Sequence, residues 1–459
     1  MNILLLYTNI NGFHEDLYSF GIASIASLAR SAGHSVRIRI VRSAAEYPAV
    51  LDEAAAFAPR MVGFTSVSSQ FVFVKELAQA VKARLGEALT ICGGVHPTIN
   101  PQCLAGAAGL DALMVGESEL SFQELLAALD AGRDWRGIDN IATRDGDGVK
   151  VNPLKPLLTD LSPLPWPMRR DYPFGDSLDK IGYVPFMFSR GCPYLCTYCS
   201  NHAIAAAYGQ QRNSPRYRSA ESSIQEIEDA MTHMEVRRVL ICDDIFGIDR
   251  AWRREFCEKY AQRIRRPMLC LLRANVMDDE FLTLLKAAGC YRISIGVESG
   301  NDFVRNEVMN RKMSREQIVS AFALARKHGI GTMAINMIGL PGETEEMLWD
   351  TIRLNRRLKP TFSGVNIFYP YRGTKLGDHC FDNDLVDLER YANFSNERRE
   401  SVLKLPESYR AKLTRYHHDW ESLVYPWSLG RRLRRIFGGT RAWGLLRSVK
   451  RSVARASRP

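Results

Sequence analysis

Residues 189–200, Ser-Arg-Gly-Cys-Pro-Tyr-Leu-Cys-Thr-Tyr-Cys-Ser, place three cysteines at C-x3-C-x2-C spacing directly after an apolar run at 184–188. A loop this short aims three thiolates at one point but does not supply a fourth. Structural zinc usually takes four protein ligands, whereas a [4Fe–4S] cluster can take three and keep one iron open. The spacing therefore favours a cluster over zinc. The alternative is three unconnected core thiols, which is less compatible with so compact a loop.

The spacing and its setting resemble the radical S-adenosylmethionine (SAM) superfamily. The resemblance implies that Cys192, Cys196 and Cys199 are the catalytic cluster ligands and that Tyr198 lies against the adenine of SAM. In that family the open iron chelates SAM. One electron, from a donor such as flavodoxin or ferredoxin, then cleaves SAM to methionine and a 5′-deoxyadenosyl radical, which abstracts hydrogen from the substrate.

The length of the chain and the number of its cysteines limit the class of protein to which it can belong. A chain of 459 residues is long enough for two or three domains with large cores. Residues 2–7 are strand-like rather than a signal peptide, and no apolar run reaches the roughly 18 residues that a membrane span needs. We therefore expect a cytoplasmic protein in which the seven cysteines outside the loop are reduced core thiols.

The first part of the chain alternates short apolar runs with helical stretches. The expected strands are 2–7, 36–41, 61–67, 89–92 and 112–115, and the expected helices are 20–33, 48–58, 69–85, 100–108 and 118–131. Such alternation predicts a Rossmann-like, doubly wound parallel sheet over residues 1–135. Ligands of such sheets bind beyond the carboxyl ends of the strands, where this chain has small residues.

The same region resembles the cobalamin-binding domain that precedes many radical SAM enzymes. The matching pieces are Gly-Phe-Thr-Ser, Gly-Gly-Val-His-Pro-Thr and Val-Gly-Glu-Ser-Glu-Leu-Ser-Phe, and the implied cobalamin contacts are Ser66, Ser68, Gly93, Gly94, Gly116 and Glu117. The Asp-x-His-x-x-Gly motif of methyl-transferring cobalamin domains is absent, because His14 lacks its partners. We therefore expect cobalamin without a protein histidine ligand. His96 is expected to orient its loop or touch a ligand edge, and the alternative is a hydrogen-bonded loop histidine. The alternative for residues 1–135 is a flavodoxin-like fold that binds nothing.

Residues 136–182 are expected to link two domains. A hairpin is predicted at 138–151 around Asp145-Gly146-Asp147-Gly148, and a proline-rich strap follows.

Residues 183–376 repeat the order strand then helix. The expected strands are 184–188, 237–242, 268–272, 291–296, 332–338 and 363–368, and the expected helices are 219–234, 250–266, 278–288, 301–309, 314–328 and 343–357. Six such units fit the partial (β/α)6 barrel of the superfamily, whose active site lies at the carboxyl ends of the strands.

Polar or glycine-containing motifs follow these strands and resemble the family's SAM-binding motifs. The implied SAM contacts are Asp243 after the second strand, Arg273 after the third, Glu298 in Gly-Val-Glu-Ser-Gly, and Gly339 in Gly-Leu-Pro-Gly-Glu. A carboxylate can accept hydrogen bonds from ribose or ammonium groups, and a guanidinium can pair with the carboxylate of SAM. Some of these residues also have a structural alternative. Asp243 or the adjacent Asp244 could be a helix N-cap, and Arg273 could belong to a surface ion pair.

The C-terminal segment, residues 377–459, is expected to be mainly helical. Its last part, 422–459, holds nine Arg, one Lys and no acid, and so carries the whole formal charge of +10. The first 421 residues are near neutral, which argues against a general polyanion-binding body. The basic and apolar tail fits peripheral contact with anionic lipid, contact with RNA phosphates, or a solvated disordered tail.

Taken together, the resemblance implies a cobalamin-dependent radical SAM enzyme, a methyltransferase that acts on an unactivated carbon through a 5′-deoxyadenosyl radical and methylcobalamin. One alternative is an oxidative cyclase or ring-rearranging enzyme. Another is a tRNA-modifying enzyme, which the near-neutral body and the lack of cysteines for a second cluster disfavour. A non-enzymatic cobalamin-responsive module is disfavoured by the intact cysteine loop. The expected substrate is a small or lipid-like molecule, and nucleic acid is the weaker expectation.

Overall fold

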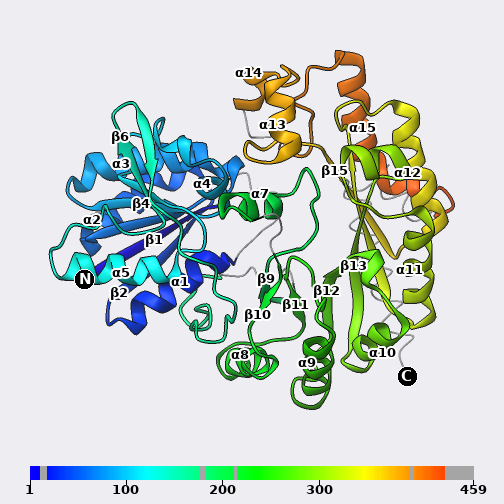
Figure 1. Ribbon diagram of the computed structural model, residues 1–459, viewed down its shortest axis with the longest axis horizontal. Coiled ribbons are helices and arrows are strands. Elements are labelled where there is room, and N and C mark those ends of the chain that lie inside the picture. Colours follow the sequence, from blue (N-terminus) through cyan, green and yellow to red (C-terminus); the bar gives the residue numbers. More distant parts are fainter. Residues whose placement is uncertain (11–17, 175–181, 211–213, 393–396, 429–459) are drawn as a thin grey trace, which may run out of the picture.

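The molecule consists of two α/β domains packed side by side, with a smaller helical region against the second domain (Figure 1). The computed structural model describes residues 1–10, 18–174, 182–210, 214–392 and 397–428.

Within the described residues, the first domain is built on a seven-stranded sheet in the order β2-β1-β3-β4-β5-β6-β7. The first five strands are parallel and the last two are antiparallel additions. The strands are β1 (Asn2–Thr8), β2 (Ser35–Val41), β3 (Met61–Thr65), β4 (Leu89–Gly93), β5 (Ala112–Met114), β6 (Ile141–Asp145) and β7 (Gly148–Val151).

Helices cover both faces of this sheet because its strands are apolar on both sides. The helices are α1 (Phe20–Ser31), α2 (Tyr47–Phe57), α3 (Phe71–Leu85), α4 (Val95–Ile99) and α5 (Glu119–Asp130). Leu4 and Leu6 pack with α2 and α3, whereas Ile3 and Leu5 pack with α1 and α5. The two alternating sets fix the register of the central strand.

Two details of the first domain differ from expectation. The hairpin expected in the linker pairs with β5 and extends the sheet. The helix expected at 100–108 is instead a 3₁₀ turn, Pro101–Leu104, and the short α4, which was not expected, lies before it. Pro101 has no N–H to donate and restricts the residue before it, and Asn100 accordingly leaves the helical region with φ −142° and ψ 65°.

The second domain contains a parallel sheet of six strands in the described part of the chain, in the order β15-β14-β13-β12-β11-β8. The strands are β8 (Val184–Phe186), β11 (Val239–Ile241), β12 (Met268–Leu272), β13 (Cys290–Glu298), β14 (Gly331–Ile338) and β15 (Phe362–Ile367). The covering helices are α8 (Ala220–His233), α9 (Arg250–Arg263), α10 (Asp279–Ala287), α11 (Arg315–Lys327) and α12 (Glu345–Leu358). Ser314 and Gln317 form the expected capping box of α11.

Between the two domains lies α7 (Ser200–Ala207), which contacts α4 of the first domain. A small antiparallel pair, β9 (Ser189–Arg190) and β10 (Arg216–Tyr217), lies beside it. The C-terminal helices are α13 (Lys375–Asp382), α14 (Leu388–Ala392) and α15 (Glu407–Val424). Trp420 and Tyr425 are buried where α15 packs on β15 and α12.

The architecture confirms the predicted fold: a Rossmann-like parallel sheet, a partial (β/α)6 barrel and a mainly helical C-terminal segment. In the described part of the chain, no helix has the length and apolarity needed to span a bilayer. The basic tail at 429–459, with its predicted lipid contact, lies outside the described residues.

Candidate functional site

The cysteine loop connects β9 to α7, and two aspartates after β11 hold the chain that enters it. The Oδ1 of Asp243 accepts the Phe188 N–H at 2.7 Å, and its Oδ2 accepts the Ser189 hydroxyl at 2.6 Å. The Oδ2 of Asp244 accepts the Gly191 N–H at 3.0 Å. Asp243 was expected to contact SAM, but both of its carboxylate oxygens accept hydrogen bonds from Phe188 and Ser189, which precede the cysteine loop. Burial raises the pKa of Asp243 to about 7, against the effect of these hydrogen bonds.

The far side of the loop is held by the end of the π-helical turn Val304–Val308 and by Asn310, two residues after it. The Thr197 hydroxyl donates to the Val308 carbonyl at 2.7 Å, and the Asn310 amide donates to the Leu195 carbonyl at 2.8 Å. Because both sides are tied to the barrel, the three thiols are presented by a rigid loop rather than by a free strand end.

The environment of the three thiols fits a metal cluster. Burial raises the pKa of Cys192 to about 11 and that of Cys199 to about 12, so both are neutral thiols at pH 7 unless a cation binds them. The Nη1 of Arg273 lies 3.5 Å from Cys196 Sγ, and its buried Nη2 has no hydrogen-bond partner among the described residues. A buried N–H without a partner beside the thiols fits an acidic group bound at this point.

Among the described residues, no group of three His, Cys, Asp or Glu side chains is arranged around a single ion. In a cubane cluster each thiolate binds a different iron, so the three sulfurs need not converge on one point.

Beside the cysteines, Tyr198, Glu298 and Arg311 form a buried polar network. The Nη1 of Arg311 donates to the Tyr198 hydroxyl at 2.7 Å and lies 3.5 Å from Glu298 Oε1. Burial raises the pKa of Glu298, opposed chiefly by the charge of Arg311. Glu298 has φ 64°, a left-handed conformation that a residue with a side chain rarely adopts.

Arg311 was not predicted from the sequence. Its neighbours Asn310 and Lys312 both have φ 50°, so the loop adopts two unfavourable conformations around it. No local pattern in the sequence indicated this role, because the partners of Arg311 come from two other parts of the chain.

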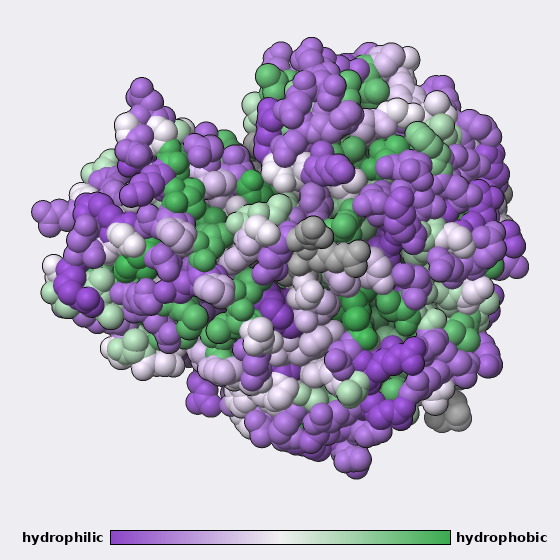
Figure 2. Space-filling view, viewed as in Figure 1, coloured by the Kyte–Doolittle hydropathy of each residue, from purple (hydrophilic) through white to green (hydrophobic). Residues whose placement is uncertain are grey.

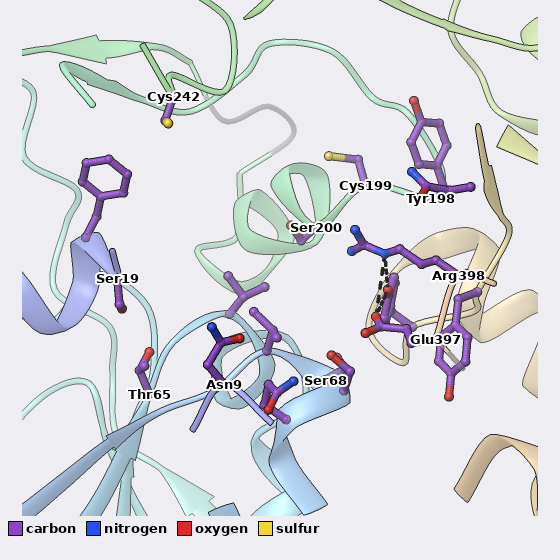
Figure 3. Close-up of a pocket in the computed structure, with 18 of the residues that line it drawn as sticks. Asn9, Ser19, Thr65, Ser68, Tyr198, Cys199, Ser200, Cys242, Glu397 and Arg398 are labelled. Atoms are coloured by element: carbon purple, nitrogen blue, oxygen red, sulfur yellow. Dashed lines mark hydrogen bonds and ion pairs between the residues drawn. The ribbon is translucent and has the colours of Figure 1, made fainter. Parts of the chain in front are cut away.

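A cavity of about 730 Å³ lies where the two domains meet, and we call it the domain-boundary cavity. Figure 3 shows that Asn9, Thr65 and Ser68 line it from the first domain, while Tyr198 and Cys199 line it from the cysteine loop. Glu298 also lines it, at the end of β13. Figure 2 shows hydrophobic residues along the boundary between the two lobes. The carboxyl ends of both parallel sheets therefore face one space.

Several first-domain residues that were predicted to contact cobalamin have close protein neighbours in the structure. A Cβ on Gly94, which has φ 103°, would lie 2.8 Å from the Ser66 carbonyl oxygen, so this glycine is required by the packing of two neighbouring loops. The Ser66 hydroxyl donates to the Val67 carbonyl at 2.8 Å. Gly93 leaves ordinary space beside Met114. Of this group, Ser68 is the residue that lines the cavity.

His96 orients its loop, as expected. Its Nδ1 lies 3.1 Å from the Ser68 hydroxyl and its ring packs on Phe71, with centroids 4.5 Å apart. Burial lowers its pKa to about 4, helped by the charge of Lys75, so the imidazole is neutral at pH 7. No histidine is among the described residues that line the domain-boundary cavity.

Gly116 and Glu117 were expected to contact cobalamin, but both are engaged by the second domain. A Cβ on Gly116, which has φ 79°, would lie 2.2 Å from the Tyr208 hydroxyl. The Glu117 carboxylate forms ion pairs with Arg190 and Arg216. Glu117 therefore forms a contact between the two domains.

Gly339 was expected to contact SAM, but its N–H donates to Glu343 Oε2 at 2.6 Å. A Cβ at Gly339 would also crowd Leu413 of α15, at 3.0 Å. Its φ of 74° and its contacts explain the glycine without a ligand. The other oxygen of Glu343, Oε1, is buried with no partner among the described residues.

The C-terminal wall of the cavity was predicted only in part from the sequence. Tyr369, Tyr371, Glu397 and Arg398 line it. The Tyr371 hydroxyl donates to Glu397 and accepts from Arg398 Nε at 2.9 Å. Glu397 and Arg398 were not singled out in the sequence, whereas Tyr369 and Tyr371 belong to the stretch that directly follows the last predicted strand, 363–368.

The chain matches two family profiles. Residues 186–354 match the radical SAM superfamily, and residues 8–126 match the B12 binding domain. The first match contains the cysteine loop, and the second contains the first-domain side of the cavity.

The chain is also similar to individual proteins. It is 26% identical over 372 residues to an uncharacterized methyltransferase, PH0819, of Pyrococcus horikoshii, covering 80% of this chain and 79% of that protein. It is 27% identical over 410 residues to the anaerobic magnesium-protoporphyrin IX monomethyl ester cyclase of Rubrivivax gelatinosus, covering 83% and 70%. Its fold is similar to the structure of the radical S-adenosylmethionine methyltransferase TsrM from Kitasatospora setae with cobalamin and a [4Fe–4S] cluster bound, with TM-score 0.70, 19% identity, and 83% and 75% coverage.

Proposed function

Because the chain belongs to the radical SAM proteins that carry a B12-binding domain, we propose that it is a cobalamin-dependent methyltransferase acting on a carbon of a small organic substrate. The observation that carries this proposal is the domain-boundary cavity, which is lined both by Cys199 and Glu298 and by the strand ends of the B12-binding domain. Two cofactors held on opposite sides of one cavity can act on one substrate between them.

In this proposal Cys192, Cys196 and Cys199 hold the [4Fe–4S] cluster. Glu298 and Tyr198 hold the ribose and adenine side of SAM, and Arg273 offers its unpartnered N–H to the SAM carboxylate. Together the bound groups supply a 5′-deoxyadenosyl radical and a transferable methyl group. The chain's own part is to orient SAM and substrate and to keep water out of the cavity.

Cobalamin is proposed to rest on Ser68 and the neighbouring strand ends of the first domain. His96 donates no ligand to cobalt in this arrangement, because its ring is turned toward Ser68 and Phe71. The substrate is proposed to lie against Phe368, Tyr369 and Tyr371, which favours a molecule with an aromatic or otherwise apolar portion. A one-electron donor such as flavodoxin or ferredoxin would reduce the cluster.

A second candidate is an oxidative cyclisation without methyl transfer, which is favoured by the similarity to the Rubrivivax cyclase. The two candidates share the cluster, SAM and the cavity. They differ in what the substrate gains or loses, so product mass separates them.

The test is anaerobic incubation of the reconstituted protein with SAM deuterated on its methyl group, cobalamin, a reductant and an extract of small molecules. Mass spectrometry is expected to find a product that has gained one deuterated methyl, only when cobalamin is present. A product that has lost hydrogens and gained no deuterium would favour the cyclase. The Cys199→Ala variant should abolish either product, whereas Cys103→Ala, a thiol of the first domain, should not.

A further inference from the structure

Both ends of the cysteine loop are tied to one short segment of the first domain, residues 116–119. The strand before the loop, β9, ends at Arg190, whose Nη1 lies 3.1 Å from Glu117 Oε2 and whose Nη2 lies 2.6 Å from Glu119 Oε1. The helix after the loop, α7, is followed by Tyr208, whose hydroxyl accepts the Glu117 N–H at 2.6 Å. Glu117 therefore contacts the chain both before Cys192 and after Cys199.

The charges explain why a carboxylate is needed at this point. Arg190 and Arg216 are direct partners across the antiparallel pair β9 and β10. Like charges directly opposite each other destabilise such a pair. The Glu117 carboxylate binds both arginines, with Oε2 3.0 Å from Arg216 Nη1 and Oε1 paired with Arg216 Nη2. Glu119 supplies the second negative charge, so two acids of the first domain balance two bases of the second.

This cluster is mostly buried, so salt and water screen it only weakly. The exposed fractions of the side chains are 25% for Arg190, 21% for Glu117, 10% for Glu119 and 9% for Arg216. Burial alone would raise the pKa of Glu117, but the hydrogen bonds and charges of Arg216 and Arg190 hold it below its ordinary value. The carboxylate is therefore ionised at neutral pH.

The backbone adds a steric restraint beside the charges. Gly116 has space for no side chain, because a Cβ would lie 2.2 Å from the Tyr208 hydroxyl. The contact between α7 and α4 lies beside it (Figure 1). Hence a shift of the segment that carries Glu117 would break its contacts with Arg190 before the cysteine loop and with Tyr208 after it.

We infer that Glu117 is a positioning residue: it sets the cysteine loop relative to the first domain, and thereby sets the separation between cluster and cobalamin, without contacting cobalamin itself. The part of this inference that concerns cobalamin rests on the proposed function. The coupling of the cysteine loop to the first domain does not.

The test compares full-length, anaerobically reconstituted variants. Glu117→Gln keeps the size of the side chain but leaves Arg190 and Arg216 with one acid between them. The double variant E117Q/R216Q restores charge balance. Glu124→Gln is the matched control, because this acid of α5 also pairs with a base, Lys155 at 3.0 Å, but lies away from the cysteine loop.

Two readouts separate positioning from cofactor contact. Titration with hydroxocobalamin should give a Kd for E117Q within about threefold of wild type. The magnetic interaction between the reduced cluster and Co(II) of cobalamin, measured by electron paramagnetic resonance, should be broadened in E117Q, largely restored in E117Q/R216Q and unchanged in E124Q. A loss of cobalamin affinity in E117Q that R216Q does not restore would overturn the inference, and so would an unchanged magnetic interaction.

Two further outcomes are decisive. If E117Q does not fold, Tyr208→Phe removes the acceptor of the Glu117 N–H and should broaden the same signal to a smaller extent, and an unchanged signal would overturn the inference. If the wild type binds no cobalamin, the proposed function fails. The inference is then judged on the electron paramagnetic resonance signal of the reduced cluster alone. This signal should become heterogeneous in E117Q but not in E124Q.

Discussion

At the scale of single residues, Glu343 gives the clearest dependence on pH. Its Oε1 is buried without a partner, and burial raises its pKa from an ordinary value near 4.5 to about 7, although two backbone N–H groups oppose the shift. A carboxyl whose pKa is higher in the folded state stabilises the fold below its unfolded pKa and loses that contribution as pH rises through the folded value.

We therefore expect the unfolding free energy of the wild type to contain a term of about 3 kcal/mol that disappears between pH 4.5 and pH 7. Glu343→Gln should remove this term. Anaerobic denaturant titrations at pH 5 and pH 8 measure it. If the unfolding free energy changes between pH 5 and pH 8 by the same amount in wild type and variant, the assignment of this term to Glu343 is contradicted.

Arg311 is expected to control SAM binding through its partners. Arg311→Met leaves Tyr198 without its donor and the buried Glu298 without its cation. Losing a charged hydrogen bond in a buried site costs about 1.5–3 kcal/mol, so the Kd of SAM should rise about 10- to 100-fold. Equilibrium dialysis with cluster-loaded protein measures the change. Lys312→Met, at the exposed neighbouring position, is the control and should bind SAM like the wild type.

The sequence indicated single residues well where a local motif carries the chemistry. The cysteine spacing and the position of Glu298 after its strand are local features, and the structure places Cys199, Tyr198 and Glu298 on one cavity. Gly94, Gly116 and Gly339, which the sequence indicated as cofactor contacts, have close neighbours that are protein atoms from distant segments, and this packing was not predicted. The contacts of Arg311 with Tyr198 and Glu298, and the raised pKa of Glu343, were not predicted, because both depend on burial by segments that are distant in the sequence.

At the scale of elements, α15 illustrates how a helix without a motif stabilises the barrel. Its Trp420 is buried and donates its indole N–H to the Ser363 hydroxyl of β15 at 2.8 Å. Trp420→Ala should lower the unfolding free energy by about 3–5 kcal/mol, because it opens a cavity and removes a buried hydrogen bond. Trp427→Ala, at a side chain that is 58% exposed, should change it by less than about 0.5 kcal/mol. Equal effects of the two changes would contradict the packing.

Strands were predicted well because each is a short apolar run between turn residues. The strand bounds at 184–186, 268–272 and 331–338 lie close to those expected. The exceptions involve partners that are distant in sequence or a local break. The hairpin at 141–151 joins the first sheet because β5 leaves an open edge, which composition does not encode. Pro101 begins a short 3₁₀ turn, Pro101–Leu104, where the sequence predicted a longer helix at 100–108.

At the scale of the whole molecule, the arrangement of the two domains was beyond sequence reasoning. Glu117 and Arg216 are 99 positions apart, and no periodic pattern relates them. The ion pairs and Tyr208 hold the carboxyl ends of two parallel sheets toward one cavity. That arrangement, rather than either domain alone, is what allows two cofactors to act on one substrate.

The most direct test of this account follows the two fates of SAM in the wild-type protein, reconstituted anaerobically with iron, sulfide and cobalamin. We predict 5′-deoxyadenosine from homolytic cleavage at the cluster, and S-adenosylhomocysteine from methyl donation that requires cobalamin. If 5′-deoxyadenosine is absent, or if S-adenosylhomocysteine forms equally without cobalamin, the assignment of a cobalamin-dependent radical methyltransferase is contradicted.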